Sequence, residues 1–263
     1  MVQGQKALVA QYLELQSRDS ADALFLTYDE EMEGAFFYPE STWAQGRNRL
    51  LEEALKRDEY LYYIFCDDDI EFRQGAWSLF EEQLEKYIPA IGVPVFPRTK
   101  PNVLKFPKFS AQPFFINDEQ LIAFHRDVVH DRIIVPYQTR FDALNWWASC
   151  EIQQILIQNF YSQGALQFNS IVIDNVCKER YSQQHESDKT FRDAVISWIG
   201  KQFVGTYKLT AHYHPPRLYQ ILWRFMVYKF RHAVGMSTFR VSSETMKRKL
   251  LGGSDLYHQT SNN

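Results

Sequence analysis

The sequence predicts an α/β fold in which helices flank a mostly parallel central sheet. Two observations support this prediction. Short apolar segments alternate along the chain with segments whose apolar residues recur at helical spacing. Such alternation is typical of parallel sheets, because the crossover between two parallel strands usually contains a helix. The chain has 263 residues, of which 45% are hydrophobic, so it can form one large core or a main domain with a small appendage.

The first half of the chain shows the alternation clearly. We expect strands at four short apolar runs, 23–28, 60–66, 90–96 and 113–117. Each run ends at or before an acid, a proline or an asparagine. Apolar residues at helical spacing predict three helices: 46–57, about 77–88, and a helix that follows Asn117 or Asp118 and buries Leu121, Ile122, Phe124, Val128 and Val129.

The second half of the chain is less regular. We expect helices at 149–161 and 188–203 and a strand at 166–173. The main domain is therefore expected to span 1–210. Residues 211–263 are expected to form a helical C-terminal extension that is basic and rich in aromatic residues.

Composition argues against several classes of function. The net charge of −3 gives no overall signature of nucleic-acid binding, so no nucleic acid is expected as a partner. Cys66, Cys150 and Cys177 lie far apart, which indicates neither a disulfide framework nor a zinc site. The first residues do not resemble a signal peptide, and no stretch is long and apolar enough for a transmembrane helix. A reducing cytoplasm is the expected compartment.

The most informative segment is residues 61–72, LYYIFCDDDIEF, in which an apolar strand ends in three adjacent acids. Ligands of parallel α/β sheets bind at the carboxyl ends of the strands. Neighbouring carboxylates repel one another, so this cluster favours a bound divalent cation, and oxygen ligands suit Mg²⁺ or Mn²⁺. If strand geometry continues, Asp67 and Asp69 point the same way and can bind one ion, while Asp68 faces another partner. A solvated acidic turn is the alternative interpretation.

In this context the segment resembles the GT-A glycosyltransferases, in which a D-x-D motif holds a divalent cation at the diphosphate of a nucleotide-sugar. The resemblance covers about residues 20–130 and includes ALFLTYDE as the first strand, GRNRLLEEAL as a helix with an R-N pair, and YYIFCDDDIEF as the D-x-D strand. GVPVFP and AQPFFINDEQLIAFHRDVV fit the segments that follow. The resemblance implies a GT-A-like fold with a nucleotide-sugar half at 20–130 and an acceptor half at 131–210.

The resemblance also implies a function. We expect a metal-dependent enzyme that moves a hexosyl-type sugar from a UDP- or GDP-sugar to a hydroxyl group of a glycan, a lipid-linked acceptor or another molecule. Mn²⁺ or Mg²⁺ is the expected cofactor, held by Asp67 and Asp69. The residues expected at the nucleotide-sugar are Tyr28, Asp29, Arg47, Asn48, Asp67 and Asp68.

Several of these residues also have a plainer interpretation. Arg47 and Asn48 could contact the base or diphosphate and fix the neighbouring loop, or they could be a solvated first-turn arginine with an Asn cap. Asp29 could accept a hydrogen bond from the nucleoside or be an ordinary acid at a strand end. Tyr28 could stack on the base or pack in the core.

The best candidate for an acceptor site is RFDALNWWASCEIQQ, residues 140–154. Because indole rings stack on sugar faces, Trp146 and Trp147 are expected to bind the acceptor. An inverting transfer needs a carboxylate to take the proton of the attacking hydroxyl, and Asp142 or Glu151 is the expected base. Glu151 could instead serve only the dipole of the helix that begins near it, and a base elsewhere in the chain is the third possibility.

Two features of the later sequence suggest further roles. His185, His212 and His214 are candidates for an additional metal ligand, with a polar loop as the alternative. Residues 217–251 contain eight Lys or Arg and one acid, a net charge of +7, interleaved with aromatic residues. Such a segment can bind an anionic membrane surface peripherally, here the inner face of a membrane, or it can pack as a helix on the main domain.

Two other classes of function compete with glycosyl transfer. Phosphatases of the haloacid-dehalogenase type also place D-x-D after an apolar strand and use the first Asp as nucleophile. They normally have Thr or Val two residues after the second Asp, where this chain has Glu71, and a strand and a helix precede the motif here. The second alternative is a binding protein with a GT-A-like fold and no turnover.

Overall fold

The computed structural model describes residues 1–18, 21–57, 60–97, 110–113, 119–145, 148–161 and 164–176, together with 193–194, 197–198 and 226. In this part of the chain nine strands form one sheet, in the order β3-β2-β1-β4-β8-β6-β9-β5, and β7 also pairs with β9. The strands are β1 (Val2–Gly4), β2 (Phe25–Thr27), β3 (Phe36–Phe37), β4 (Tyr62–Asp67), β5 (Ile70–Gln74), β6 (Ile91–Val95), β7 (Ala111–Pro113), β8 (Leu121–His125) and β9 (Ala165–Asn175).

Most strands of the sheet run in one direction. β1 to β4 are parallel to one another, and β6 is parallel to β9. β8 lies between these two groups and is antiparallel to both β4 and β6. β5 and β7 are antiparallel to β9. Because β1, β2 and β4 are neighbours that run the same way, their carboxyl ends form one edge of the sheet.

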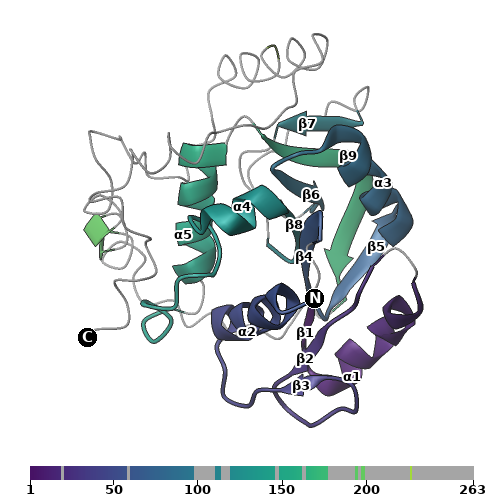
Figure 1. The fold of residues 1–263 in the computed structure, drawn as a ribbon, viewed down its shortest axis with the longest axis vertical. Coiled ribbons are helices and arrows are strands. Elements are labelled where there is room, and N and C mark those ends of the chain that lie inside the picture. The colour runs from purple at the N-terminus through teal and green to yellow at the C-terminus, as the bar shows by residue number, and fades with distance from the viewer. Residues whose placement is uncertain are drawn as a thin grey trace.

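Helices cover both faces of the sheet. They are α1 (Lys6–Val9), which continues as a 3₁₀ helix at Ala10–Ser17, α2 (Trp43–Leu55), α3 (Trp77–Tyr87), α4 (Arg126–Asp131), and α5 (Ala148–Leu156), which continues as a π-helical turn at Ile157–Tyr161. Figure 1 shows α2, α4 and α5 on one side of the sheet and α1 and α3 on the other. The predicted α/β fold, with a mostly parallel central sheet flanked by helices, is confirmed.

The core has two parts, one on each face of the sheet. Alternation along β8 shows this directly: Ile122 and Phe124 join the cluster under α2, α4 and α5, while Leu121 and Ala123 join the cluster under α1 and α3. Every residue of β8 is therefore buried. A strand covered on both faces loses the polar–apolar alternation by which a half-buried strand is recognised.

The prediction of a helix over Leu121–Val129 is wrong for this reason. Residues Leu121–His125 form β8, and the helix α4 begins only at Arg126. A short continuous apolar run does not distinguish a buried strand from a buried helix by periodicity alone. The structure also adds β1, α1 and β5, none of which was expected.

The other predicted elements agree with the structure within a few residues where they are described. Strands overlap 23–28, 60–66, 90–96 and 166–173, and helices overlap 77–88 and 149–161. The helix predicted at 46–57 begins earlier, at Trp43.

Some predictions fall partly or wholly outside the described residues. The strand predicted at 113–117 overlaps β7 only at Pro113, and 114–118 lie outside the described residues. Of 188–203, only 193–194 and 197–198 are described, and they are helical. The division at 210 and the C-terminal extension stay predictions. Among the described residues, no helix has both the length and the apolar character needed to cross a bilayer.

Candidate active site

The three acids lie at the edge of the sheet where β1, β2 and β4 end together. The register pairs Gln3 with Asp67 and Gly4 with Thr27, so the residues that follow these strands meet at one edge. This is the edge at which ligands bind in α/β folds. This edge is therefore the candidate functional site.

Asp67 ends β4 and is held by two side chains of α2. Its Oδ1 accepts hydrogen bonds from Trp43 Nε1 at 3.0 Å and from Arg47 Nη2 at 2.7 Å. Trp43 and Arg47 are four residues apart, so they project from the same face of the helix. The side chain of Asp67 is 19% exposed, and no described residue donates a hydrogen bond to its other oxygen, Oδ2. One oxygen is thus fixed and the other is available to a ligand.

Arg47 is buried in the middle of this arrangement. Its Nη1 donates to the hydroxyl of Tyr137 at 3.1 Å, and its Nη2 also donates to the carbonyl of Glu119 at 2.8 Å. The guanidinium carbon lies 4.0 Å from the centre of the Trp43 ring, a cation–π contact. With 1% of its side chain exposed, Arg47 is not a solvated first-turn arginine and presents almost no surface to a ligand. We interpret it as a positioning residue for Asp67.

Asn48 fixes a neighbouring loop rather than capping a helix. Its Nδ2 donates to the carbonyl of Tyr137 at 2.8 Å, and its Oδ1 accepts from the backbone N–H of Tyr137 at 2.6 Å. The start of α2 is capped instead by Thr42, whose hydroxyl and backbone N–H exchange hydrogen bonds with Gln45. The Arg47–Asn48 pair therefore lies in the second turn of α2 and does not open the helix.

Asp68 points towards β1. Its Oδ2 accepts a hydrogen bond from the backbone N–H of Gln5 at 2.6 Å. The carboxyl group lies directly against Gly4, where an added Cβ would come within 1.8 Å of the Asp68 Cγ, so only glycine fits there. The pKa of Asp68 is raised to about 7, chiefly by burial; the Gln5 hydrogen bond lowers it, and the neighbouring carboxylates also raise it. Ionisation of this carboxyl group therefore destabilises the folded state.

Asp69 lies in the turn between β4 and β5 and is also buried. Its Oδ2 accepts from Asn175 Nδ2 at 3.2 Å, at the end of β9. Asp67 and Asp69 thus contact different groups, and the expectation that both follow strand geometry is wrong because β4 ends at Asp67. Among the described residues, no three or more His, Cys, Asp or Glu side chains are arranged as a metal-binding group.

Tyr28 and Asp29 follow β2 at the same edge. Asp29 Oδ1 accepts from the backbone N–H groups of Lys6 at 2.7 Å and of Glu30 at 2.8 Å, so it holds the start of α1. Tyr28 is exposed, and its backbone N–H donates to the carbonyl of Gly4 at 3.3 Å. Both residues are therefore near the acids along the sheet edge.

Asp142 attaches to the first turn of α2. Its Oδ2 accepts a short hydrogen bond from the hydroxyl of Thr42, the residue directly before Trp43. Its Oδ1 is buried without a partner among the described residues. Burial raises the pKa of Asp142 to about 6, although the Thr42 hydrogen bond lowers it. Asp142 and Asp67 are thus both anchored to the same helical turn, through consecutive residues.

The remaining predicted residues are placed less fully. Glu151 lies in the first turn of α5 and is half-buried. Trp146 and Trp147 lie outside the described residues, as do the three histidines considered as metal ligands, His185, His212 and His214. Of the basic segment 217–251, only Met226 is described. Roles for these residues stay predictions.

A cluster of three buried polar residues that contacts Arg47 was not expected from the sequence. Glu119, Gln153 and Tyr137 are all buried. With its amide oriented to satisfy hydrogen bonds, Gln153 donates to the carboxylate of Glu119 and accepts from the Tyr137 hydroxyl at 3.3 Å. Buried polar side chains are retained where they are paired, and here the pairing supports the residues that hold Arg47. Polar residues scattered through apolar segments give no sequence signal of their mutual contact.

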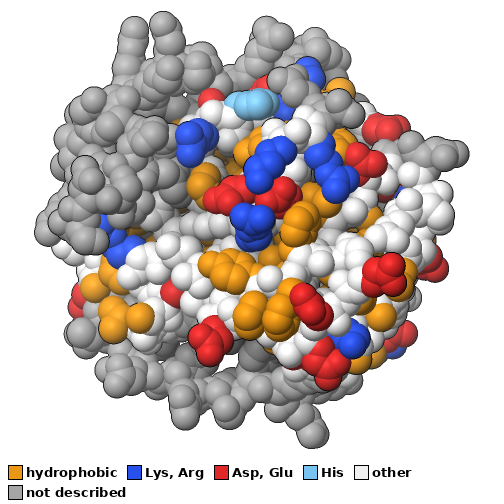
Figure 2. Space-filling view, turned by 60° about the horizontal axis from the view of Figure 1, so that its bottom comes forward, with side chains coloured by type: hydrophobic (Ala, Val, Ile, Leu, Met, Phe, Trp, Pro, Cys, Tyr) orange, Lys and Arg blue, Asp and Glu red, His pale blue; other side chains and the backbone are white. Residues whose placement is uncertain are grey.

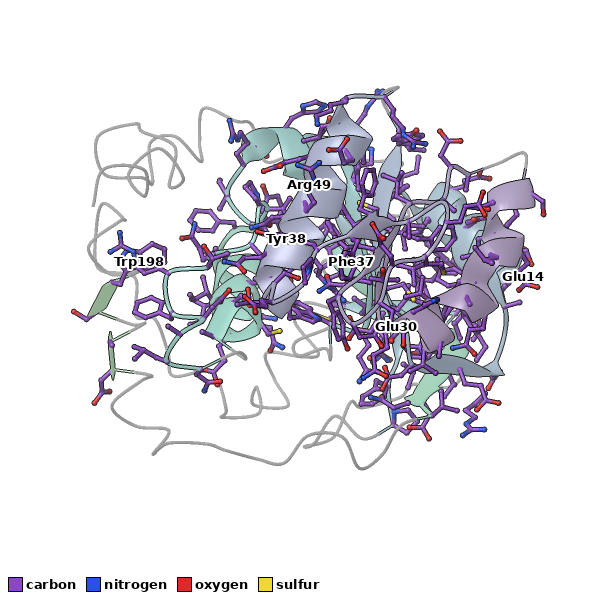
Figure 3. The ribbon with its side chains drawn as sticks, turned by 90° about the horizontal axis from the view of Figure 1, so that it is seen from below. Glu14, Glu30, Phe37, Tyr38, Arg49 and Trp198 are labelled. Carbon is purple, nitrogen blue, oxygen red and sulfur yellow. The ribbon has the colours of Figure 1, made fainter. Side chains whose placement is uncertain are left out.

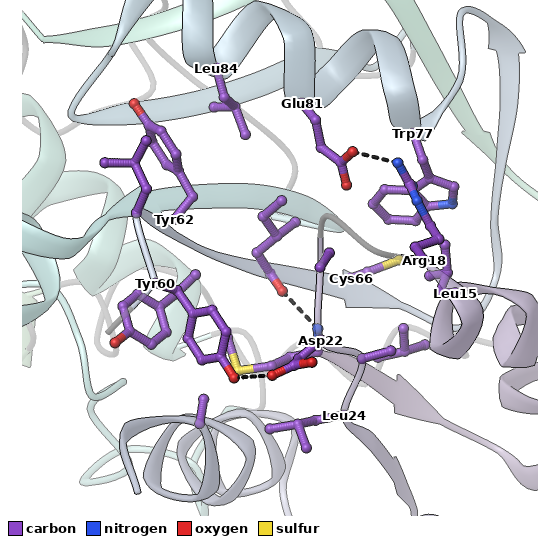
Figure 4. Close-up of a pocket in the computed structure, with 18 of the residues that line it drawn as sticks. Leu15, Arg18, Asp22, Leu24, Tyr60, Tyr62, Cys66, Trp77, Glu81 and Leu84 are labelled. Atoms are coloured by element: carbon purple, nitrogen blue, oxygen red, sulfur yellow. Dashed lines mark hydrogen bonds and ion pairs between the residues drawn. The ribbon is translucent and has the colours of Figure 1, made fainter. Parts of the chain in front are cut away.

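A separate cavity of about 200 Å³ lies at the opposite end of the strands, near the start of β1 and β2. Figure 4 shows its mostly apolar lining, which includes Leu24, Trp77 and Leu84. An ion pair between Arg18 and Glu81 and a hydrogen bond between Tyr60 and Asp22 lie along it. None of the residues predicted for the functional site lines this cavity.

Comparison with known proteins shows only distant likeness. No family model matches the sequence, and no curated protein is significantly similar to it. Among solved structures, TarS 1–349 of S. aureus has a TM-score of 0.48 and 11% identity, covering 94% of this chain and 76% of that chain. The same TarS segment in complex with UDP-GlcNAc has a TM-score of 0.49 and 10% identity, covering 94% and 77%.

A third solved structure is the galactosyltransferase LgtC in complex with donor and acceptor sugar analogs. It has a TM-score of 0.34 and 11% identity, and the alignment covers 94% of this chain and 99% of that chain.

Proposed function

We propose that the protein is a metal-dependent glycosyltransferase. It moves a hexosyl-type sugar from a UDP- or GDP-sugar to a hydroxyl group of a glycan, a lipid-linked acceptor or another molecule. One observation carries the proposal: three consecutive acids, Asp67 to Asp69, occupy the carboxyl edge of parallel strands, and Asp67 is oriented there by Arg47 and Trp43. A solvated acidic turn would not need a buried arginine to hold it.

Asp67 Oδ2 accepts no hydrogen bond from a described residue and is a suitable oxygen ligand for a divalent cation that is bound partly through its nucleotide. Mg²⁺ in such sites typically takes one or two carboxylates and completes its shell with water and phosphate oxygens. Asp67 and Asp69 are the residues expected to hold it. A bound cation would also offset the repulsion between the adjacent carboxylates. When bound, the cation would neutralise charge that develops on the diphosphate leaving group.

The reaction requires a base as well as a donor site. The bond between the anomeric carbon and the diphosphate oxygen breaks, and its electron pair stays on the nucleoside diphosphate. The acceptor oxygen forms the new bond to that carbon, and its proton passes to a base. Asp142 is the residue we favour, because its buried Oδ1 has no partner among the described residues. A pKa of about 6 leaves it mostly ionised at pH 7 and more basic than an ordinary carboxylate.

The residues proposed to contact the nucleotide-sugar are chosen by their position along the sheet edge. Asp68, Asp29 and Tyr28 lie near the acids and are proposed to contact the nucleotide-sugar. Glu151 stays the alternative base, and Trp146 with Trp147 the proposed acceptor contacts. A cytoplasmic location and peripheral membrane contact through 217–251 are also part of the proposal.

A thermal-shift screen of UDP- and GDP-sugars with Mn²⁺ or with EDTA tests the function. A ligand at one hundred times its Kd stabilises the folded state by about 2.7 kcal/mol, which is a readily measured shift. We expect a shift with at least one nucleotide-sugar and Mn²⁺, and release of the nucleoside diphosphate on incubation. A shift without release would favour the binding protein, and no shift with any nucleotide-sugar would contradict the proposal.

A further inference from the structure

A second surface beside α2 has the chemistry of a carbohydrate site. It is an open hollow of about 560 Å³ between β3 and the outer face of α2, and its lining includes Phe37, Tyr38, Gln45, Arg49, Glu52 and Thr139. Figure 3 shows the side chains of Phe37, Tyr38 and Arg49 on this side of the molecule, beside α2. In Figure 2 the same lower face carries hydrophobic side chains interspersed with basic and acidic ones.

The aromatic side of the hollow is exposed and held in place. Phe37 is 40% exposed and Tyr38 is 38% exposed, and they are adjacent in the chain. The backbone of Tyr38 is fixed on both sides, because its N–H donates to the carbonyl of Thr27 at 2.9 Å and its carbonyl accepts from the Ser41 hydroxyl at 2.8 Å. Both residues line the hollow, and each exposed ring offers an apolar surface on which a ligand can stack.

The opposite side of the hollow is polar and nearly neutral. Gln45 uses its Oε1 to cap α2, which leaves its N–H₂ group without a partner among the described residues. Glu52 is exposed and forms no ion pair with a described residue. Arg49 pairs with Glu53 at 2.7 Å. Among the described residues, one cation and one anion line the hollow, so it does not select a polyanion such as a nucleotide.

A sugar ring matches this combination. Its C–H face is apolar and suits an aromatic platform, and its hydroxyl groups at the edge suit amide, carboxylate and guanidinium partners. A peptide strand is a poorer fit, because β3 has only two residues and offers a very short edge for strand addition. A neutral carbohydrate therefore fits the hollow better than a nucleotide or a peptide strand does.

The hollow adjoins Asp142 but not the acidic turn. The carbonyl of Thr139, which lines the hollow, accepts a hydrogen bond from the backbone N–H of Asp142 at 3.1 Å. Trp43 and Arg47, which hold the acidic turn, project from the opposite face of α2 from Gln45. A single ring in the hollow is thus separated from a donor sugar by the helix. A longer glycan can occupy the hollow with one ring and present another ring near Asp142.

We propose that this hollow binds one sugar ring of an oligosaccharide acceptor, at a subsite remote from the hydroxyl that reacts. The inference rests on the proposed glycosyl transfer and narrows its acceptor to a chain of two or more rings. Phe37 and Tyr38 supply the stacking surface, and Gln45 and Glu52 bind hydroxyl groups.

Saturation-transfer NMR on the full chain tests the proposal with cellotetraose, chitotetraose and maltotetraose, without nucleotide or metal. We expect at least one tetrasaccharide to bind. Phe37→Ala and Tyr38→Ala should each weaken that binding by about tenfold, equivalent to roughly 1.4 kcal/mol. Tyr38→Phe keeps the aromatic ring, so its Kd for the tetrasaccharide should stay within about twofold of the Kd of the parent chain.

A matched control removes a similar apolar group elsewhere. Leu13 is 40% exposed on the 3₁₀ helix that follows α1, so Leu13→Ala should leave tetrasaccharide binding unchanged. Thermal unfolding of every variant checks that the fold is retained. If Phe37→Ala does not fold, the comparison between Tyr38→Ala and Tyr38→Phe still decides the result. Absence of tetrasaccharide binding, or equal binding by the parent chain and the alanine variants, overturns the proposal.

Failure of this proposal can be told apart from failure of the proposed function. UDP binding with Mn²⁺, measured on the same samples, should be unaffected by Phe37→Ala and Tyr38→Ala. Nucleotide binding without saccharide binding would contradict the proposed subsite but not the proposed transferase function. Saccharide binding that the alanine variants weaken, without any nucleotide binding, would support the hollow as a glycan site and contradict the proposed transferase function.

Discussion

Replacing Asp68 by Asn should change how stability depends on pH. The pKa of Asp68 is raised from its usual 3.8 to about 7 by burial and by the adjacent carboxylates, so the folded chain holds this proton more tightly than the unfolded chain does. The free energy of unfolding therefore falls as pH rises from about 4 to about 7. Each pKa unit corresponds to 1.36 kcal/mol, so ionisation of Asp68 costs the folded state about 4 kcal/mol at most.

Asp68→Asn should recover about half of this cost, or about 2 kcal/mol at pH 8, because it removes the charge but adds an amide N–H₂ group that needs partners. The amide oxygen can still accept the hydrogen bond from Gln5. Urea unfolding of the parent chain and the variant at several pH values between 4 and 8 measures the difference. As pH rises, the free energy of unfolding of the variant should increase relative to that of the parent. Mn²⁺ should stabilise the parent more than the variant.

Glu31→Gln is a suitable control, because Glu31 is an exposed acid after β2 and should show no such gain. Asp142 also titrates in this range with a pKa of about 6, but it contributes equally to the parent and to Asp68→Asn. Parallel curves for the parent and Asp68→Asn from pH 4 to pH 8 would refute the reasoning, because they would show that Asp68 ionises without cost.

Three other changes test separate parts of the account. Arg47→Met should lower the free energy of unfolding by roughly 2–4 kcal/mol in chemical denaturation, because it leaves the partner carboxylate unpaired, whereas Arg49→Met on the exposed face should cost no more than about 0.5 kcal/mol. Asp142→Asn should lower turnover by a factor on the order of 10²–10⁴, with nucleotide binding intact, and should remove the rise in kcat through about pH 6 that ionisation of the base predicts. If Glu151→Gln has that effect instead, the base is reassigned. Co-sedimentation with phosphatidylserine vesicles should be salt-sensitive and should require 217–251, and absence of vesicle binding at low salt would contradict a membrane role for this segment.

The sequence was most informative where apolar periodicity and acids coincide. The apolar run that becomes β4, with its acids at one end, places the acidic turn correctly at the sheet edge. β8 could not be recognised in the same way, because burial on both faces removed the alternation that distinguishes a strand. The T-x-x-Q pattern from Thr42 to Gln45 is a capping box and could have placed the start of α2 three residues earlier than 46, at Trp43.

The partners of the acids could not be predicted from spacing alone. Asp68 meets the backbone of Gln5, which is 63 residues earlier, and Asp69 meets Asn175, which is 106 residues later. Arg47 was identified as a candidate, but its burial was not, because a single arginine in a helix gives no sign of the aromatic and carbonyl groups that will surround it. These contacts depend on strand order, and local pattern does not specify strand order.

Calorimetric titration of UDP and GDP, with Mn²⁺ and with EDTA, tests most directly whether the acidic turn is a metal-dependent nucleotide site. One of the two nucleotides should bind with Mn²⁺ and should bind at least about tenfold more weakly in EDTA, a loss of roughly 1.4 kcal/mol. Asp69→Ala should abolish the difference between the two conditions, while Glu31→Gln should retain it. Equal affinity with Mn²⁺ and with EDTA, or no binding of either nucleotide, would contradict the account.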